Sequence, residues 1–236
     1  MHRKAVAGAV LMALSLAGAA SAQTMIDIDQ PGMTLANVLG HSFRVGDKIF
    51  TFTQNSFLSD QFNANQIFIS SFQNADPMTG VGFRLTGAFN DLTPGDLDPS
   101  GFMLTYSVTV APEFAAQGYR LTHGQLRFNG AATGAGSFAR VDETMRTAAD
   151  MLIGTGNVQA TEGGPNVYGH DFVSSEPVTH INVVKNVRFF AAGEGGTASA
   201  SFVDQGFGQT VIIPLPGTAG LGLAGLGLVA LRRRRR

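Results

Sequence analysis

The residues best suited to chemistry lie in one acidic stretch, 90–98, which contains Asp91, Asp96 and Asp98. Carboxylate and amide oxygens are the ligands that Ca²⁺ prefers, so these aspartates could form a calcium site. The stretch lacks the central glycine and the closing glutamate of an EF-hand loop. Pro94-Gly95 and Asp98-Pro99 equally predict two consecutive solvent-exposed turns. We favour turns, and no other cofactor is indicated.

No group of residues indicates a catalytic centre. Ser174, His170 and Asp171 could be drawn as a triad, but a chain of this size offers such combinations by chance. His170 and His180 lack the i+2 or i+4 spacing of paired metal ligands. Two carboxylates could also act on a glycosidic bond, but the candidates are many and dispersed: Asp91, Asp96, Asp98, Glu113, Asp142 and Glu143. We therefore predict no catalytic residues and a protein that is not an enzyme.

The aromatic residues argue weakly against sugar binding. The chain has 18 Phe but no Trp and only three Tyr, and sugar platforms are usually amphipathic aromatics. Tyr106 lies in a strong strand pattern and is expected in the core. Phenylalanine can also stack on a sugar ring, so the scarcity of Trp and Tyr does not exclude sugar binding.

Charge and cysteine content narrow the classes of partner and site. Residues 23–216 hold all 17 acidic residues and nine basic ones, a formal net charge of 9 − 17 = −8. A domain of this charge is a poor partner for nucleic acid, which requires a basic patch. There is no cysteine, which excludes disulfides, thiolate metal sites and cysteine nucleophiles.

Alternation of apolar and polar residues predicts that strands would position any site. About ten or eleven strands, with turns rich in Gly, Pro and Asp between them, are expected of a β-sandwich. The chain is thus predicted to be all-β, with one jelly-roll-like sandwich over residues 23–210. The clearest strands are Lys48–Thr53, Ile67–Ile69, Gly82–Leu85, Met103–Val110, Tyr119–Phe128, Ser137–Thr144, His180–Val184, Val187–Ala191, Ser199–Val203 and Thr210–Ile213.

Helical patterning is weak. Thr34–Leu39 and Glu143–Leu152 could each form a turn or two of helix. The glycine-rich stretch Gly193–Gly196 predicts a hairpin loop, since no Lys-Ser/Thr follows as in a phosphate-binding loop.

The N-terminus predicts a signal peptide over residues 1–22. Arg3 and Lys4 precede an apolar run that ends at Ala20-Ser21-Ala22. This small-x-small pattern is the one that signal peptidase accepts, so cleavage is expected between Ala22 and Gln23.

The C-terminal segment 211–236 has three parts. Pro214, Leu215 and Pro216 precede an apolar stretch, 217–231, and a basic end formed by Arg232, Arg233, Arg234, Arg235 and Arg236. Fifteen residues of helix rise roughly 22 Å, less than the ~30 Å hydrocarbon core, which suits a short transmembrane helix that holds the chain temporarily. The arginines would keep the end cytoplasmic. An ordinary C-terminal anchor that is never cut is the alternative.

This tail resembles the PEP-CTERM sorting signal, which an exosortase recognises. Leu215 stands where that motif has Glu, so the tail is a Pro-Leu-Pro variant. The middle of the chain is similar to a group of PEP-CTERM passenger domains of unknown function. The similarity rests on Val45–Phe52, Leu104–Val110 and Ala200–Gln209, in which Gly46-Asp47 is read as a turn and Asp204–Gly208 as the turn of a last hairpin.

Together these features predict an exported protein with a non-catalytic structural or adhesive domain. The resemblance implies signal peptidase and an exosortase-like enzyme as partners, transient residence in the inner membrane, and delivery to the cell surface or extracellular matrix beside exopolysaccharide. The alternative is a secreted domain that binds or cleaves polysaccharide through surface carboxylates; a concave, carboxylate-lined groove would favour it.

Overall fold

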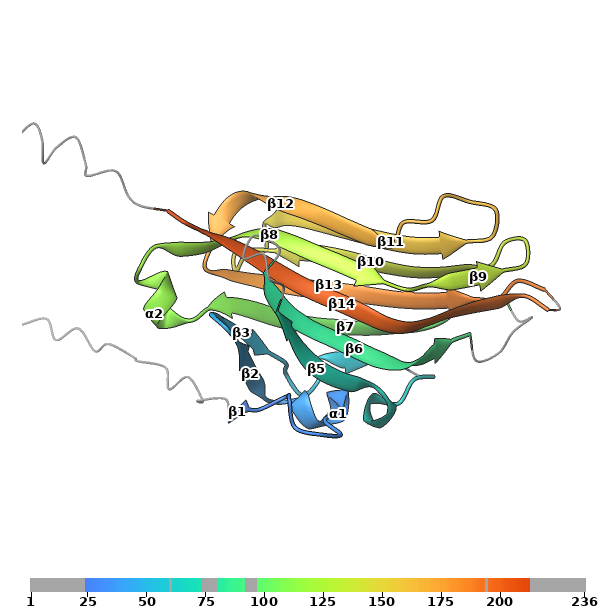
Figure 1. The fold of residues 1–236 in the computed structure, drawn as a ribbon, viewed down its shortest axis with the longest axis horizontal. Coiled ribbons are helices and arrows are strands. Elements are labelled where there is room, and N and C mark those ends of the chain that lie inside the picture. Colours follow the sequence, from blue (N-terminus) through green and yellow to red (C-terminus); the bar gives the residue numbers. More distant parts are fainter. Residues whose placement is uncertain (1–23, 60, 74–79, 92–96, 194, 213–236) are drawn as a thin grey trace, which may run out of the picture.

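The structure, a computed structural model, describes residues 24–59, 61–73, 80–91, 97–193 and 195–212 (Figure 1). The predicted signal peptide and the sorting tail from Pro214 onward lie outside these ranges, so both stay predictions. Within the described ranges, no helix is both long and apolar enough to cross a membrane.

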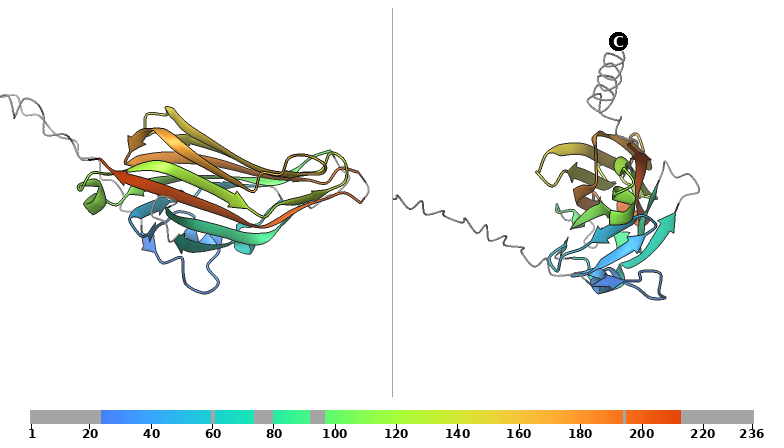
Figure 2. Two further views of the ribbon diagram at one scale, coloured as in Figure 1. Left: turned by 45° about the horizontal axis from the view of Figure 1, so that its top comes forward. Right: turned by 90° about the vertical axis from the view of Figure 1, so that its left-hand side faces the viewer.

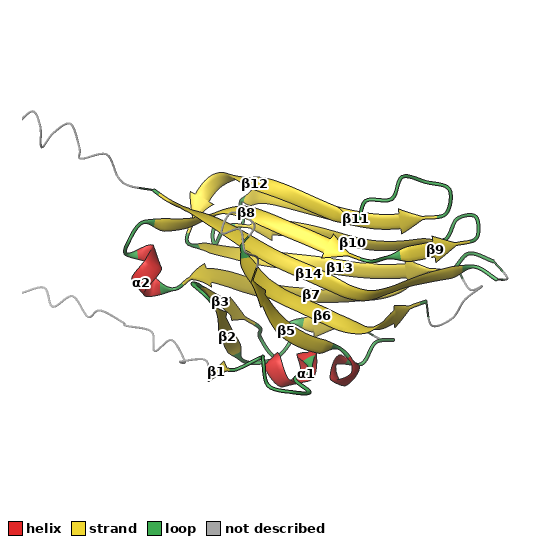
Figure 3. Ribbon diagram, in the orientation of Figure 1, coloured by secondary structure: helices red, strands yellow, loops and turns green. Residues whose placement is uncertain are grey.

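Strands dominate the described chain, and helix is confined to three short segments at its margins (Figure 3). The helical segments are α1 (Leu35–Val38), η1 (Ala64–Gln66) and α2 (Pro112–Ala115). The strands are β1 (Met25–Ile26), β2 (Ser42–Val45), β3 (Lys48–Thr51), β4 (Phe57–Leu58), β5 (Phe68–Gln73), β6 (Val81–Asn90), β7 (Ser100–Val110), β8 (Tyr119–Phe128), β9 (Ala131–Thr133), β10 (Phe138–Arg146), β11 (Leu152–Thr161), β12 (Gly169–Val178), β13 (His180–Phe190) and β14 (Thr197–Val211).

The strands form two sheets that pack face to face (Figures 1 and 2). The eight-stranded sheet has the order β1-β2-β3-β7-β13-β10-β11, with β4 also paired to β7. The six-stranded sheet has the order β12-β8-β14-β6-β5, with β9 also paired to β14. All pairs are antiparallel except β1 with β2. The prediction of an all-β sandwich is confirmed.

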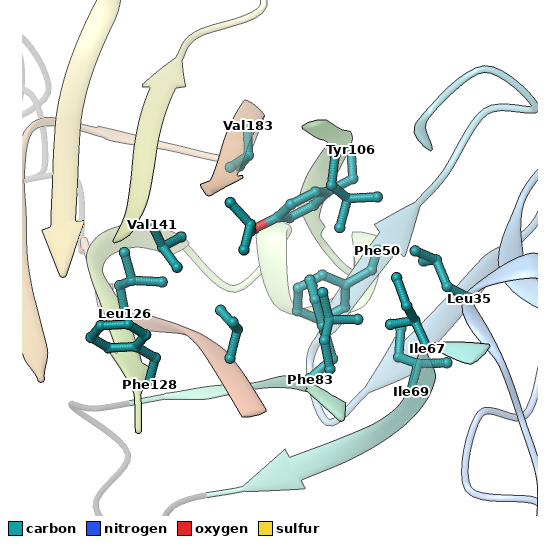
Figure 4. Packing of buried hydrophobic residues seen from close by; sticks show 14 of the residues in the cluster. Leu35, Phe50, Ile67, Ile69, Phe83, Tyr106, Leu126, Phe128, Val141 and Val183 are labelled. Atoms are coloured by element: carbon teal, nitrogen blue, oxygen red, sulfur yellow. The ribbon is translucent and has the colours of Figure 1, made fainter. Parts of the chain in front are cut away.

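Alternation along the strands produces the core between the sheets. Every second residue of β7, from Ser100 to Val110, is buried, and β10 repeats the pattern. Phe83 packs against the rings of Phe43, Phe50, Phe52 and Tyr106, with centroids 5.2–6.0 Å apart. Figure 4 shows this aromatic part of the core beside an aliphatic part that includes Leu126, Val141 and Val183.

Two local predictions are wrong. Glu143–Leu152 is not helical: residues 138–146 form β10, in which Glu143 pairs with Gly156 of β11 and with Lys185 of β13. Pairing on both sides outweighs the weak helical preference of the segment. Asp204–Gly208 is not a turn but the middle of β14, where Gly206 lies opposite Gly82.

The region after β10 also differs from the expectation. Strands β11 and β12 were not predicted, because glycines interrupt the alternation of β11. At Gly154 a Cβ would lie 2.7 Å from the Phe172 ring, so a residue without a side chain is needed there. The separate strands expected at His180–Val184 and Val187–Ala191 are one strand, β13.

Tyr106 is buried, as predicted, and offers a test of the core at alkaline pH. Burial, and then the negative charge of Glu143, raise the pKa of Tyr106 well above its ordinary value. The stabilisation linked to its protonated form is present below the unfolded pKa of about 10 and is lost as pH rises through the folded value. We expect the phenolate absorbance that appears before alkaline unfolding to be the same in wild type and Tyr106→Phe. A smaller pre-unfolding signal in Tyr106→Phe would contradict the buried placement.

Candidate functional site

The outward face of the six-stranded sheet carries a row of polar side chains. Strand register places Ser70 of β5 beside Arg84 of β6, Arg84 beside Asp204 of β14, and Asp204 beside Arg127 of β8. These four residues, called the polar row below, come from four strands that are adjacent in space. Residues at matching register positions project on the same side of a sheet, so the row presents one continuous polar surface.

Arg84 is held in place from two sides. Its Nε and Nη2 donate to Asp204 Oδ1 and Oδ2, at 2.6 and 2.7 Å, and the hydrogen bond to Asp204 raises the pKa of Arg84. Its guanidinium lies 4.3 Å from the centroid of the Phe202 ring. A bidentate carboxylate and a ring face together fix the plane of a guanidinium. The N–H groups of Arg84 that do not bind Asp204 are therefore held in a fixed orientation.

A second ion pair closes the other end of the row. Arg127 Nη2 donates to both oxygens of Asp171 on β12, at 2.9 and 2.8 Å, and Gln125 Nε2 donates to Asp171 Oδ1 at 3.2 Å. The hydrogen bond from Arg127 holds the pKa of Asp171 below its ordinary value. Asp171 therefore stays ionised near neutral pH, whereas a glycosidase general acid needs a raised pKa.

A hollow of about 540 Å³ lies over the polar row. Beside the polar row, strand register places Gly82 of β6 opposite Gly206 of β14, with Phe72 of β5 on one side and Gln125 of β8 on the other. The two glycines have no side chains, so the space above them stays open and forms the hollow. At Gly82 a Cβ would lie 1.6 Å from the Gln205 carbonyl oxygen, which makes glycine necessary at this position. The hollow is lined by Ser70, Ser71, Phe72, Gln73, Arg84, Gln125, Arg127 and Asp204.

A second hollow, of about 510 Å³, lies further along β5 and β6. Its lining combines the amides of Asn63, Asn65, Gln66 and Asn90 with the ring of Phe68, which is 49 % exposed. Phe68 pairs with Thr86, two residues along β6 from Arg84. The two hollows thus follow the same pair of strands.

The predicted calcium residues are placed as follows. Asp91 is buried: its Oδ1 accepts from Ser100 Oγ at 2.8 Å and its Oδ2 from the Ala191 N–H at 2.7 Å. Asp98 is exposed, and Asp96 lies outside the described residues. Within the part of the chain that is described, no cluster of three His, Cys, Asp or Glu could hold a metal ion. In this arrangement Asp91 ties the end of β6 to β7 and β13.

We expect Asp91→Ala to lower the free energy of unfolding by about 1–3 kcal/mol for each donor left without a partner. The exposed Asp98→Ala is the control and should lower the free energy of unfolding by less than Asp91→Ala does, because water can replace the partners of an exposed carboxylate. Urea unfolding of both variants, with and without added Ca²⁺, makes the comparison. A Ca²⁺-dependent gain in wild type that Asp91→Ala loses would instead support the calcium site.

The other candidate sets are not brought together. Asp171 and His170 are neighbours on β12 and so point to opposite faces, while Ser174 Oγ donates to the Glu176 carbonyl at 2.6 Å. His180 Nδ1 lies 2.8 Å from Thr109 Oγ1. Glu143 is buried between the sheets, whereas Asp142 faces outward and pairs with Arg140 and Arg188.

The sequence alone does not reveal the polar row. Arg84 and Asp204 are 120 residues apart, and only strand pairing makes them neighbours. The one local signal was the glycine-rich segment 204–208, which was interpreted as a turn.

No protein-family model and no curated protein matches the chain. Among solved structures, one of TmCBM61 in complex with beta-1,4-galactotriose aligns with a TM-score of 0.32 at 8 % identity, over 66 % of this chain and 87 % of that one. A DUF4465 family protein from Bacteroides caccae aligns with a TM-score of 0.28 at 10 % identity, over 65 % of this chain and 93 % of that one. A family 35 carbohydrate binding module from an environmental isolate aligns with a TM-score of 0.24 at 13 % identity, over 61 % of this chain and 99 % of that one. Scores this low carry no argument about ligand or activity.

Proposed function

We propose that this chain is an exported, jelly-roll-like β-sandwich domain that binds polysaccharide on the outward face of its six-stranded sheet. The observation that carries the proposal is the hollow over the polar row. Sugars present neighbouring hydroxyls, which planar guanidinium, carboxylate and amide groups can bind in pairs. In this hollow Arg84, Asp204 and Gln125 supply such groups.

Phe72 adds an apolar surface at the edge of the same hollow. The apolar faces of sugar rings pack against aromatic side chains, and a mixed lining of this kind is usual for small-molecule sites. The second hollow beside Phe68 would extend contact along β5 and β6 for a polymer longer than a few sugars.

The hollow favours a polysaccharide-binding domain over one that acts only as a scaffold. Binding without cleavage is the form that we propose, because Asp171 is held ionised and Asp204 is engaged by Arg84. A protein of this kind would serve the adhesive role in a matrix that the export signals suggest.

Affinity electrophoresis against neutral and acidic exopolysaccharides tests the proposal. Arg84→Ala and Arg146→Ala remove side chains of the same type with similar exposure, 44 % and 42 %, and only Arg84 lines the hollow. We expect Arg84→Ala to weaken binding about tenfold, as loss of a charge-assisted hydrogen bond does, and Arg146→Ala to bind as wild type does. Equal affinity of the two variants, or no binding to any polymer, would overturn the proposal.

Export and sorting need a separate measurement. The intact mass of the protein from surface and culture fractions of its host should lack residues 1–22 and the segment after about Pro216. A mass that retains Gly217–Arg236 would contradict cleavage by an exosortase-like enzyme and favour an uncut anchor.

A further inference from the structure

Three polar side chains meet inside the core, away from the polar row. Glu143 of β10 and Lys185 of β13 lie directly opposite each other in the eight-stranded sheet, and Gln205 projects towards them from β14 of the other sheet. Their exposed fractions are 2 %, 0 % and 0 %. This buried triad therefore bridges the two layers of the sandwich.

The amine of Lys185 contacts both of the other functional groups. Lys185 Nζ donates to Glu143 Oε2 and also to Gln205 Oε1, the second at 2.6 Å. Glu143 Oε1 has no hydrogen-bond partner among the described residues. Within the described part of the chain, the Gln205 amide nitrogen makes one long contact, 3.4 Å, to the Gly206 carbonyl. The Lys185 amine thus lies against both a carboxylate and a carboxamide.

The surroundings of the triad are apolar apart from the buried hydroxyl of Tyr106, whose pKa the charge of Glu143 raises. Val141 and Met145 flank Glu143 on its face of β10, Val183 and Val187 flank Lys185, and all four are buried. Val203 and Phe207 flank Gln205 in the same way. Burial lowers the pKa of Lys185, and the nearby charge of Glu143 opposes that shift only in part. A low-dielectric site of this kind eases proton transfer from the ammonium to the carboxylate.

We propose that Lys185 and Gln205 become joined by an intramolecular isopeptide bond, with Glu143 as the catalytic proton carrier. A neutral amine is a nucleophile, and contact with its target supplies the proximity that the reaction needs. The chain contains no cysteine, so this bond would be a covalent link between the sheets that needs no disulfide.

The reaction balances without a co-reactant. Glu143 takes a proton from the Lys185 ammonium, and the freed lone pair of Nζ attacks Cδ of Gln205. The protonated Glu143 carboxyl donates to the developing oxyanion. The bond from Cδ to Nε2 then breaks, and Glu143 passes protons from Nζ to the leaving nitrogen. One secondary amide forms and one ammonium ion departs, so charge and atoms are conserved and nothing is oxidised or reduced.

Peptide mapping of the purified, denatured full-length protein by trypsin and tandem mass spectrometry tests the proposal. We expect no cleavage after Lys185, and one cross-linked species that contains Lys185 and Gln205 and lacks one ammonia. Intact mass alone is insufficient, because an N-terminal Gln23 exposed by signal-peptide cleavage also loses ammonia when it cyclises.

Lys48 is an internal control in the same digest. It is also buried, at 1 % exposure, and its Nζ is 2.8 Å from Asp47 Oδ1 with no carboxamide contact recorded in the described structure. Cleavage after Lys48 should be normal. If peptides ending in Lys185 are recovered from folded protein as fully as those ending in Lys48, the proposal is wrong.

Two variants separate chemistry from folding. Glu143→Gln should fold, by circular dichroism, yet form the link at least tenfold more slowly. Lys185→Met should show no link at all, and its intact mass should differ from wild type by the side-chain change plus one ammonia. A cross-link of wild-type yield in Glu143→Gln would overturn the role of Glu143.

Discussion

Replacing Glu143 with leucine is expected to lower the free energy of unfolding by about 3–5 kcal/mol. The substitution leaves the Lys185 ammonium at 0 % exposure with Gln205 Oε1 as its one remaining hydrogen-bond acceptor among the described residues. An uncompensated buried charge is among the most destabilising changes a core can suffer. Since domains of this kind are stable by only about 5–15 kcal/mol, the variant should unfold at much lower urea concentration.

The double variant Glu143→Leu/Lys185→Met distinguishes a lost charge partner from lost volume. Removing both charges and filling the space with apolar atoms is often neutral or stabilising, so most of the loss should be recovered. If Lys185 is linked to Gln205 in wild type, neither variant forms the link, so each should lose a further amount of about 3 kcal/mol, the entropic value for closing a loop of roughly twenty residues, and only the loss due to the unpaired charge should be recovered in the double variant. A double variant less stable than Glu143→Leu would contradict the account of the pair.

Alternation predicts several of the strands that are buried on one face, although it misses β12. The alternation predicts a strand over residues 119–128, and β8 has these same bounds. Tyr106 was placed in the core on the same ground. Alternation does not predict a strand where glycine replaces an alternating side chain, as at Gly154 of β11, because the reason for glycine there is the close approach of the Phe172 ring from β12.

The two candidate sites differ in how far they can be predicted without knowledge of which strands pair. The polar row joins residues from β5, β6, β8 and β14, and its members could not be associated before the sheet order was known. One residue of the buried triad can be recognised in the sequence. Lys185 stands between Val183 and Val187, where alternation predicts an inward-facing apolar residue. A charged residue at such a position indicates a buried partner, although the sequence does not say which residue it is.

The second large effect is expected at the centre of the aromatic core. Phe83 is fully buried and contacts the rings of Phe43, Phe50, Phe52 and Tyr106, which come from three strands of the opposite sheet and the segment beside them. Phe83→Ala should lower the free energy of unfolding by about 3–5 kcal/mol, because transfer energy is lost and the surrounding rings cannot collapse into the cavity.

Phe68→Ala is the matched control, since it removes the same atoms from the adjacent strand of the same sheet. Phe68 is 49 % exposed, so its truncation should cost about 1 kcal/mol or less. Urea unfolding at constant pH measures both variants. Because Phe68 lines the second hollow and Phe83 does not, polysaccharide affinity should show the reverse order, with folded Phe83→Ala binding as wild type does. Equal losses of stability in the two variants would contradict a core formed between the inward faces of the two sheets.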